Sequence, residues 1–245
     1  MTAPRLSRRH VVGAGLTLSG AAGGGIAGCT WASGSPRVAE RGLAAAPALK
    51  PPITYVALGA SDAAGVGVED PQRDGWVAVL GRSLPQPTRV VNLGIPGIKL
   101  AEALQVELPP AVDSAPDLVT VWMVVNDVLG GVPLDEYRAA LRRLLRELRV
   151  RTRAKVAVGN LPDAPEQSTY LGVPPDTRPA LTASWNETIA AAVAEYGAVL
   201  VNVFRHWDVA NHAEYIGPDG LHPTATGYRA LAGVFLQTLR EHRIV

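Results

Sequence analysis

The chain has 245 residues, of which 47% are hydrophobic and 18% charged, a composition typical of a globular protein with one sizeable core. The formal net charge is +1, and removal of the three basic residues Arg5, Arg8 and Arg9 near the N-terminus changes it to −2. A nearly neutral body gives no electrostatic basis for binding nucleic acid, so we expect no nucleic-acid partner.

The first segment of the chain, residues 1–28, has the layout of a secretory signal. A basic start is followed by the mildly apolar run Val11–Ala27 and then by Cys29, which is the single cysteine. Ser7-Arg-Arg-His-Val-Val12 resembles the twin-arginine export motif, and Ile26-Ala-Gly-Cys29 resembles the bacterial lipobox. These resemblances imply that Cys29 is lipidated and becomes the first residue of the mature protein.

Two other interpretations of this segment are a membrane-spanning helix and an ordinary signal that releases a soluble protein. The apolar run is short and rich in glycine, whereas a span needs about 20 apolar residues. We therefore expect an exported lipoprotein on the outer face of the cell membrane, with secretion as the alternative. The predicted parts are a signal at 1–28, a flexible Ala-, Gly-, Ser- and Pro-rich tether at 29–52 and a folded body at 53–245.

Along the body, short apolar runs alternate with helical patterns. Strands are expected at Ile53–Leu58, Arg89–Asn92, Leu118–Val124, Lys155–Asn160 and Ala198–Val203. Helices are expected near Gly75–Leu84, Leu100–Glu107, Leu134–Thr152, Arg178–Tyr196 and Thr226–Glu241. This alternation predicts one α/β domain with a five-stranded parallel sheet that helices cover on both faces.

The first strand leads directly to the first site-like stretch. The run Ile53–Leu58 breaks at Gly59 and delivers Ser61 into a turn of small residues. Ligands in open α/β sheets bind beyond the carboxyl ends of the strands, so Ser61 lies where chemistry is usually done. On this segment alone, a simple strand-ending turn capped by Ser or Asp is the favoured interpretation.

Three later stretches are also polar or glycine-rich where an apolar run stops. Gly97 follows the second strand in a turn where a backbone N–H can approach a ligand closely. Asn126 ends the third strand and is either an oxyanion donor or a turn residue. Asp219 precedes His222 by three residues on a tight loop, where a carboxylate can orient an imidazole, although an exposed turn is the alternative.

Taken together, these motifs resemble the SGNH (GDSL-type) hydrolase family. The order is Gly-x-Ser, Asn-x-x-x-x-Gly, Asn-Asp and Asp-x-x-His-Pro, and it spans the chain from about Tyr55 to Tyr228. The resemblance implies a three-layer α/β/α sandwich of flavodoxin-like topology. It also implies hydrolysis of acyl esters without a metal or cofactor.

The resemblance assigns a role to each motif residue. Ser61 would be the nucleophile, and His222, with Asp219 behind it, would act as the general base and then as the general acid. The oxyanion hole would consist of the backbone N–H groups of Ser61 and Gly97 and the side chain of Asn126. The G-x-S-x-G arrangement of the other common serine hydrolases does not fit, because the second glycine is missing.

The sequence departs from the family pattern at three positions. The family's Gly-Asp-Ser-Leu reads Gly59-Ala60-Ser61-Asp62, so an acid is lost before the nucleophile and another follows it. Val125 replaces the glycine before Asn-Asp. We interpret these changes as divergence in specificity or rate, and we expect Asp62 to disfavour anionic substrates.

The predicted function is therefore a serine esterase of carboxylesterase or lipase type. The alternatives are an O-deacetylase of cell-envelope polysaccharide and a ligand-binding lipoprotein that keeps the fold without turnover. Expected partners are an ester substrate and the membrane, through a lipid on Cys29, and the protein is expected to be a monomer. His206 and His212 have no carboxylate cluster nearby that would complete a metal site, so we expect no metal.

Overall fold

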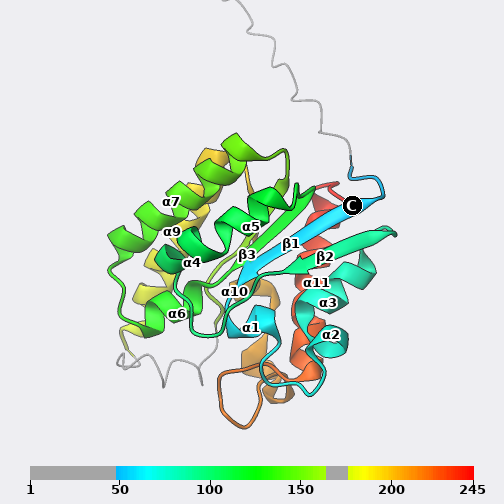
Figure 1. Ribbon diagram of the computed structural model, residues 1–245. Coiled ribbons are helices and arrows are strands. Elements are labelled where there is room, and N and C mark those ends of the chain that lie inside the picture. Colours follow the sequence, from blue (N-terminus) through cyan, green and yellow to red (C-terminus); the bar gives the residue numbers. More distant parts are fainter. Residues whose placement is uncertain (1–47, 164–175) are drawn as a thin grey trace, which may run out of the picture. The chain divides into compact units, whose positions relative to one another are not determined.

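The centre of the fold is a parallel sheet of five strands (Figure 1). The computed structural model describes residues 48–163 and 176–245, so the predicted signal, Cys29 and most of the tether lie outside the described residues. The strands are β1 (Ile53–Gly59), β2 (Thr88–Asn92), β3 (Leu118–Trp122), β4 (Lys155–Gly159) and β5 (Val199–Val201). Their order is β2-β1-β3-β4-β5, which is the flavodoxin-like topology, and the predicted fold class is confirmed.

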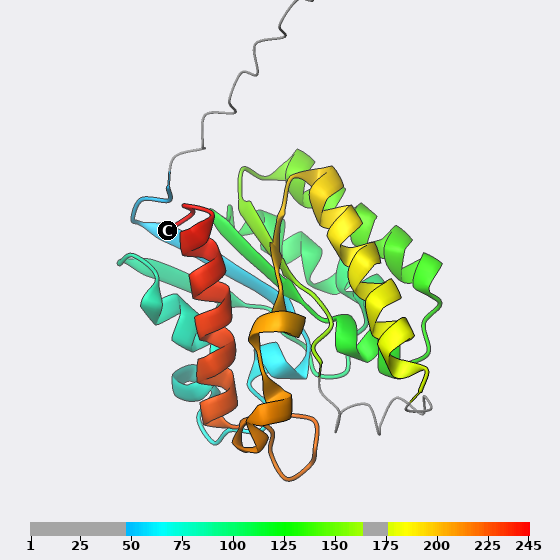
Figure 2. The same ribbon diagram turned by 180° about the vertical axis from the view of Figure 1, so that it is seen from behind.

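Helices cover both faces of the sheet, as Figures 1 and 2 show from opposite sides. One face carries α3 (Trp76–Ser83) and α11 (Ala225–Glu241), which pack against each other. The other carries α4 (Leu100–Val106), α5 (Leu108–Asp113), α7 (Leu134–Arg151) and α9 (Arg178–Tyr196). Every residue of β3 is buried between these layers, which explains why its sequence is a continuous apolar run rather than an alternating one.

Short helices follow several strands at the carboxyl edge of the sheet. They are α1 (Ser61–Ala64), α2 (Pro71–Asp74), α6 (Val124–Leu129) and α10 (Val203–His206), with 3-10 turns η1 (Val209–Asn211) and η2 (Ala213–Tyr215). The sequence reasoning missed these elements. A helix of four to six residues has too few turns to display a 3.6-residue period.

Three predicted strands were too long, Lys155–Asn160 by a single residue and the other two by more. The strand expected to reach Val124 ends at Trp122, because Val124 and Val125 already belong to α6. The strand expected at Ala198–Val203 is only Val199–Val201, since the Asn202 side chain accepts a hydrogen bond from the Arg205 amide and caps α10. After β3, the buried start of α6 is as apolar as a buried strand, and after β5 the apolar Val203 is the first residue of α10.

An aromatic cluster joins the sheet to the α3–α11 layer. The Trp76 ring stacks on Phe235 with centroids 4.6 Å apart, and its edge contact with Trp122 has a centroid distance of 6.4 Å. Trp122 in turn meets Trp207 edge-on at 5.8 Å. Such pairs add to the apolar area that they bury, and here they fix the end of β3 beside the candidate site.

None of the helices within residues 48–163 and 176–245 combines the length and apolar character needed to cross a bilayer.

Candidate active site

Ser61 is the first residue of α1, immediately beyond the carboxyl end of β1. The turn is compact, because the Val66 amide donates to the Ser61 carbonyl at 2.9 Å and Gly65 ends the helix in the left-handed conformation. The Ser61 side chain is partly exposed, whereas Ala60 and Ala63 on either side are buried. The fold therefore presents one hydroxyl at the edge where parallel sheets bind ligands.

His222 and Asp219 complete a hydrogen-bonded chain with this hydroxyl. The distance from Ser61 Oγ to His222 Nε2 is 2.9 Å, and the distance from His222 Nδ1 to Asp219 Oδ2 is 2.6 Å. With the proton on Nδ1, the ring donates to the carboxylate, and Nε2 accepts from the serine hydroxyl. The structure thus brings Ser61 together with the Asp219–His222 pair, two motifs that the sequence singled out separately.

The loop that carries Asp219 and His222 is closed by its own backbone. The Gly217 amide donates to the His222 carbonyl at 2.8 Å, and the second oxygen of Asp219, Oδ1, accepts from the amides of Leu221 and His222 at 3.0 Å each. Gly67 packs against this loop with φ +101°, and a Cβ there would lie 2.7 Å from the Pro223 carbonyl oxygen. The loop that carries the imidazole is therefore held by its own hydrogen bonds and by the close packing of Gly67.

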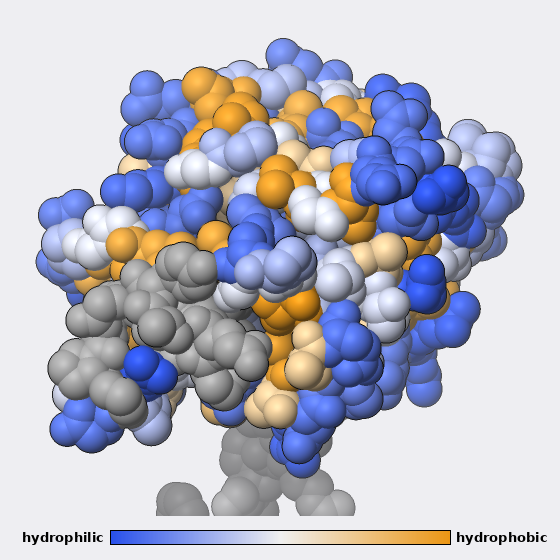
Figure 3. Space-filling view, turned by 90° about the horizontal axis from the view of Figure 1, so that it is seen from below, coloured by the Kyte–Doolittle hydropathy of each residue, from blue (hydrophilic) through white to orange (hydrophobic). Residues whose placement is uncertain are grey.

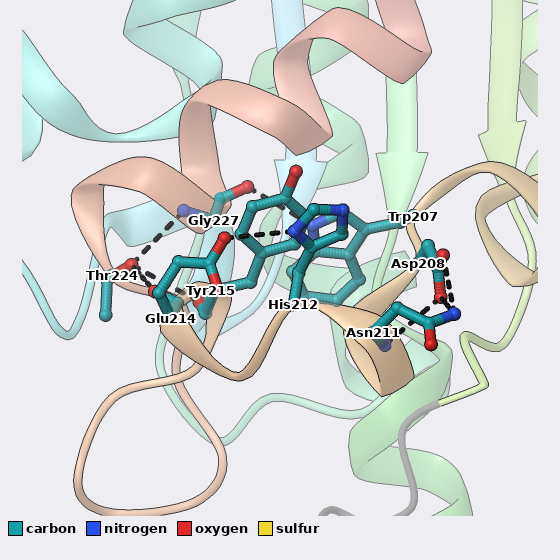
Figure 4. A network of polar contacts seen from close by, with 8 residues as sticks. All are labelled: Trp207, Asp208, Asn211, His212, Glu214, Tyr215, Thr224 and Gly227. Carbon is teal, nitrogen blue, oxygen red and sulfur yellow. Dashed lines mark hydrogen bonds and ion pairs between the residues drawn. The ribbon is translucent and has the colours of Figure 1, made fainter.

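A polar network supports the chain just before this loop (Figure 4). His212 Nδ1 lies 3.0 Å from Glu214 Oε1, and its ring stacks on Tyr215 with a centroid distance of 4.6 Å. Thr224 caps α11 by accepting from the Gly227 amide. His212 thus has a partner within its own segment, and no group of three metal-ligating side chains occurs among the described residues.

Asn126 and Asp127 tie α6 to the loop between β2 and α4. The Asn126 side chain donates to the Ile98 carbonyl at 2.9 Å, and the buried Asp127 accepts from the Leu100 amide at 3.0 Å. An amide side chain has two N–H bonds, so Asn126 keeps one that can donate to a bound ligand. Burial raises the pKa of Asp127 to about 6, against the hydrogen bond from the Leu100 amide and the attraction of Lys99.

Gly97 lies on the same loop with φ +81°, a left-handed conformation that favours glycine. It is exposed and falls outside the set of described residues that line the pocket beside Ser61. Its neighbour Ile98 accepts the hydrogen bond from Asn126, so the two predicted oxyanion donors belong to connected segments.

A small pocket opens beside the Ser61 hydroxyl. Figure 3 views the molecule from this edge of the sheet, where apolar surface lies between hydrophilic regions. The cavity has a volume of about 30 Å³. Its lining residues come from two strand ends and the histidine loop: Ala60, Ser61, Asp62, Trp122, Met123, Val125, Asn126, Leu221, His222 and Pro223.

The two carboxyl groups nearest the histidine have different proton affinities. Partial burial acts to raise the pKa of Asp219, but hydrogen bonds from the Leu221 amide and from His222 outweigh it, and the pKa lies below its usual value. Burial instead raises the pKa of Asp62 to about 7, against hydrogen bonds from backbone amides of its own turn and the attraction of His222. The Asp219 carboxyl is thus ionised at neutral pH, whereas the Asp62 carboxyl is about half ionised.

Sequence reasoning missed several residues of this site. Met123 and Leu221 line the pocket but have no chemical signature in the sequence. Glu107 is a buried acid that accepts a hydrogen bond from the Gly59 amide at 3.1 Å. A signal for it existed, since Glu107 falls on the apolar stripe of Leu100, Ala103, Leu108 and Ala111, where a charged residue is unusual.

Comparisons with known proteins agree with this arrangement. The model of the GDSL-like Lipase/Acylhydrolase family matches residues 57–230. The solved structure of TesA is 26% identical, with a TM-score of 0.65 over 77% of this chain and 99% of its own. A search of curated protein sequences finds no match.

Two further solved structures are similar in fold. The psychrotrophic esterase EstA from Pseudoalteromonas sp. is 21% identical, with a TM-score of 0.63 over 77% of this chain and 97% of its own. Axe2, an acetylxylan esterase from Geobacillus stearothermophilus, is 20% identical, with a TM-score of 0.62 over 77% and 94% of the two chains.

Proposed function

The chain belongs to the GDSL-like lipase/acylhydrolase family, and we propose that it hydrolyses carboxylic esters through an acyl-enzyme on Ser61. The observation that carries the proposal is the hydrogen-bonded chain from Ser61 through His222 to Asp219, with distances of 2.9 and 2.6 Å. A serine hydroxyl is a poor nucleophile at neutral pH unless a base removes its proton, and this arrangement supplies that base.

In the first step, Ser61 Oγ attacks the ester carbonyl carbon while His222 Nε2 takes the hydroxyl proton. The imidazolium that forms is stabilised by Asp219, whose lowered pKa keeps it ionised. The tetrahedral intermediate collapses, the alcohol leaves with the proton from His222, and an acyl-enzyme remains. Water activated by the same imidazole then releases the acid and restores Ser61.

The negative oxygen of the tetrahedral intermediate requires hydrogen-bond donors. We assign this role to the backbone N–H groups of Ser61 and Gly97 and to the Asn126 side chain. Asn126 lines the pocket and has one N–H left after its bond to Ile98, which supports its part in the assignment.

A specific observation favours short acyl groups over long ones. The cavity beside Ser61 has about 30 Å³ between the described residues, which is room for a group near the size of acetyl. Removal of O-acetyl groups from a polysaccharide is therefore the second candidate function, and one structural neighbour is described as an acetylxylan esterase.

The test is a hydrolysis profile of the full-length protein over 4-nitrophenyl esters from acetyl to palmitoyl, together with acetylated sugars. We expect kcat/KM to fall as the acyl chain lengthens, and Ser61→Ala to abolish turnover of every ester. A folded wild-type protein that hydrolyses none of them would support the alternative of a ligand-binding protein without catalysis.

We also propose that the protein is exported and held on the outer face of the cell membrane by a lipid on Cys29. The support comes from the sequence of residues 1–29 alone. Two or more acyl chains hold a protein stably at a bilayer, whereas a single chain does not.

Metabolic labelling with a palmitate analogue tests this anchoring. The wild-type protein should be labelled and should sediment with membranes, and Cys29→Ser should lose the label and appear in the soluble fraction. An unlabelled wild-type protein in the medium would indicate the secreted alternative.

A further inference from the structure

Glu107 is a buried acid for which the proposed reaction has no role. It stands between α4 and α5, and only 1% of its surface is exposed. One carboxyl oxygen, Oε2, accepts from the Gly59 amide at 3.1 Å, and the other, Oε1, is buried with no hydrogen-bond partner among the described residues. Burying a carboxyl group in this way is costly, so a purely apolar side chain would suit the packing better.

The contacts of Glu107 join the two segments that the reaction depends on. Gly59 is the last residue of β1 and lies two positions before Ser61. The Ile95 amide, which lies two positions before Gly97, also faces the Glu107 carboxyl and donates to the Gly59 carbonyl at 3.1 Å. One buried carboxyl therefore holds the nucleophile turn against the loop of the proposed oxyanion donor.

We propose that Glu107 is a positioning residue. Its carboxyl fixes the turn at Gly59–Ser61 relative to the loop that carries Ile95 and Gly97, and it replaces the acid missing at Ala60. The inference rests on the proposed function and extends it to a side chain that does not touch the substrate. Ala60 is itself buried at 4% exposure next to Gly59, so the buried acid beside this turn comes from the junction of α4 and α5 instead of from position 60.

The charge state of Glu107 agrees with this role. Burial raises the pKa of Glu107 to about 8; the hydrogen bond from the Gly59 amide opposes the rise, and the nearby Asp62 adds to it. At neutral pH the group is mostly a neutral carboxylic acid, which can still accept from the Gly59 amide.

Two substitutions of matched length separate positioning from packing. Glu107→Gln keeps an oxygen that can accept from the Gly59 amide, whereas Glu107→Met keeps the length and volume without a strong acceptor. We expect Glu107→Gln to retain kcat within about 3-fold and Glu107→Met to lose about 10- to 100-fold in kcat with little change in KM. Leu141→Ala is the control, because it removes buried side-chain volume from α7, which contributes no residue to the pocket beside Ser61.

The measurements are kcat and KM on 4-nitrophenyl acetate, with circular dichroism at the assay temperature to verify folding. Equal kcat for the Gln and Met variants, or a loss in Leu141→Ala as large as that in Glu107→Met, would overturn the positioning role. A wild-type protein that is inactive on every ester would instead overturn the proposed function, so the two failures are distinguishable.

A double variant tests the replacement directly. Ala60→Asp added to Glu107→Met returns an acid to the turn, and we expect kcat to recover at least 5-fold relative to Glu107→Met alone. Ala60→Asp alone should lower kcat, because it places a second acid beside Glu107. A folded double variant no faster than Glu107→Met would contradict the replacement of one carboxyl by the other.

Discussion

At the scale of single residues, three side chains from two distant parts of the chain meet in one hydrogen-bonded line. Ser61 and His222 are 161 positions apart in sequence, yet their reactive atoms are 2.9 Å apart. This contact requires both segments to be held in place. Hydrogen bonds within the α1 turn hold Ser61, and those of the closed loop, against which Gly67 packs, hold His222. Catalysis by these three residues therefore depends on the supporting contacts as well.

Asn126 gives a direct test of the oxyanion assignment. Its remaining N–H would donate to an oxygen that becomes negative only as the reaction proceeds, so Asn126→Ala should lower kcat by about 10²–10³ and leave KM nearly unchanged. Steady-state kinetics on 4-nitrophenyl acetate measure this split. A rise in KM at constant kcat would assign Asn126 to substrate binding instead.

Asp62 should make the substrate preference depend on pH. Its pKa of about 7 means that its carboxyl becomes negative as pH rises through neutrality, and a negative group in the pocket repels an anionic acyl chain. The ratio of kcat/KM for 4-nitrophenyl butyrate to that for the 4-nitrophenyl monoester of succinic acid should therefore grow between pH 6 and 8. Any effect of pH that is the same for both esters cancels in the ratio.

Asp62→Leu is the matched variant for this measurement. The ratio in Asp62→Leu should be smaller than in the wild type and independent of pH over the same range. A wild-type ratio that does not change with pH, or a variant that keeps the wild-type trend, would rule out Asp62 as the source of charge selectivity.

At the scale of elements, the long helices and the buried strands could be predicted, and the short elements at the active edge could not. The helix Arg178–Tyr196 was predicted with the observed bounds, because a proline lies at its start and Gly197, in the left-handed conformation, ends it. The helix α6 was read as a continuation of β3, because Val124 and Val125 are apolar in either state. The site residues themselves were recognised from motif order, while Glu107 was read only as the end of a helix, since its partner Gly59 lies 48 positions earlier.

Gly67 tests whether the histidine loop is held by the turn after α1. Gly67→Ala places a Cβ against the Pro223 carbonyl and strains a backbone with φ +101°, at a cost of about 1–3 kcal/mol. We expect a lower melting temperature together with a lower kcat, because the imidazole moves. Gly233→Ala in α11 is the control, since a Cβ there meets nothing within 4 Å and alanine favours a helix.

Thermal unfolding and kcat should both be measured for this pair of glycine variants. Gly233→Ala should be at least as stable as the wild type and equally active. A Gly67→Ala protein with wild-type kcat would mean that the loop holds its position without support from Gly67.

At the scale of the whole molecule, the buried acids beneath the nucleophile make stability depend on pH. The pKa of Glu107 rises from 4.5 to about 8 on folding, so between these values the folded state keeps a proton that the unfolded state has released. The free energy of unfolding should therefore fall as pH rises from about 5 to 8, with a contribution from Glu107 of up to about 1.4 kcal/mol per pH unit.

Urea unfolding of the wild type and of Glu107→Gln at several pH values isolates this contribution. The variant should lose stability less steeply across the window, whereas Glu187→Gln, which changes an exposed acid of α9, should keep the wild-type slope. Identical slopes in all three proteins would show that Glu107 is ionised in the folded state, contrary to its burial.

The central claim is that Ser61 is a nucleophile activated by His222, and a fluorophosphonate probe tests it most directly. The probe should add covalently to the wild-type protein, and mass spectrometry of the digested protein should locate the adduct on the peptide that contains Ser61. His222→Ala should react far more slowly, and Ser61→Ala should not react at all. Labelling of another residue, or a folded wild-type protein that stays unlabelled, would contradict the account.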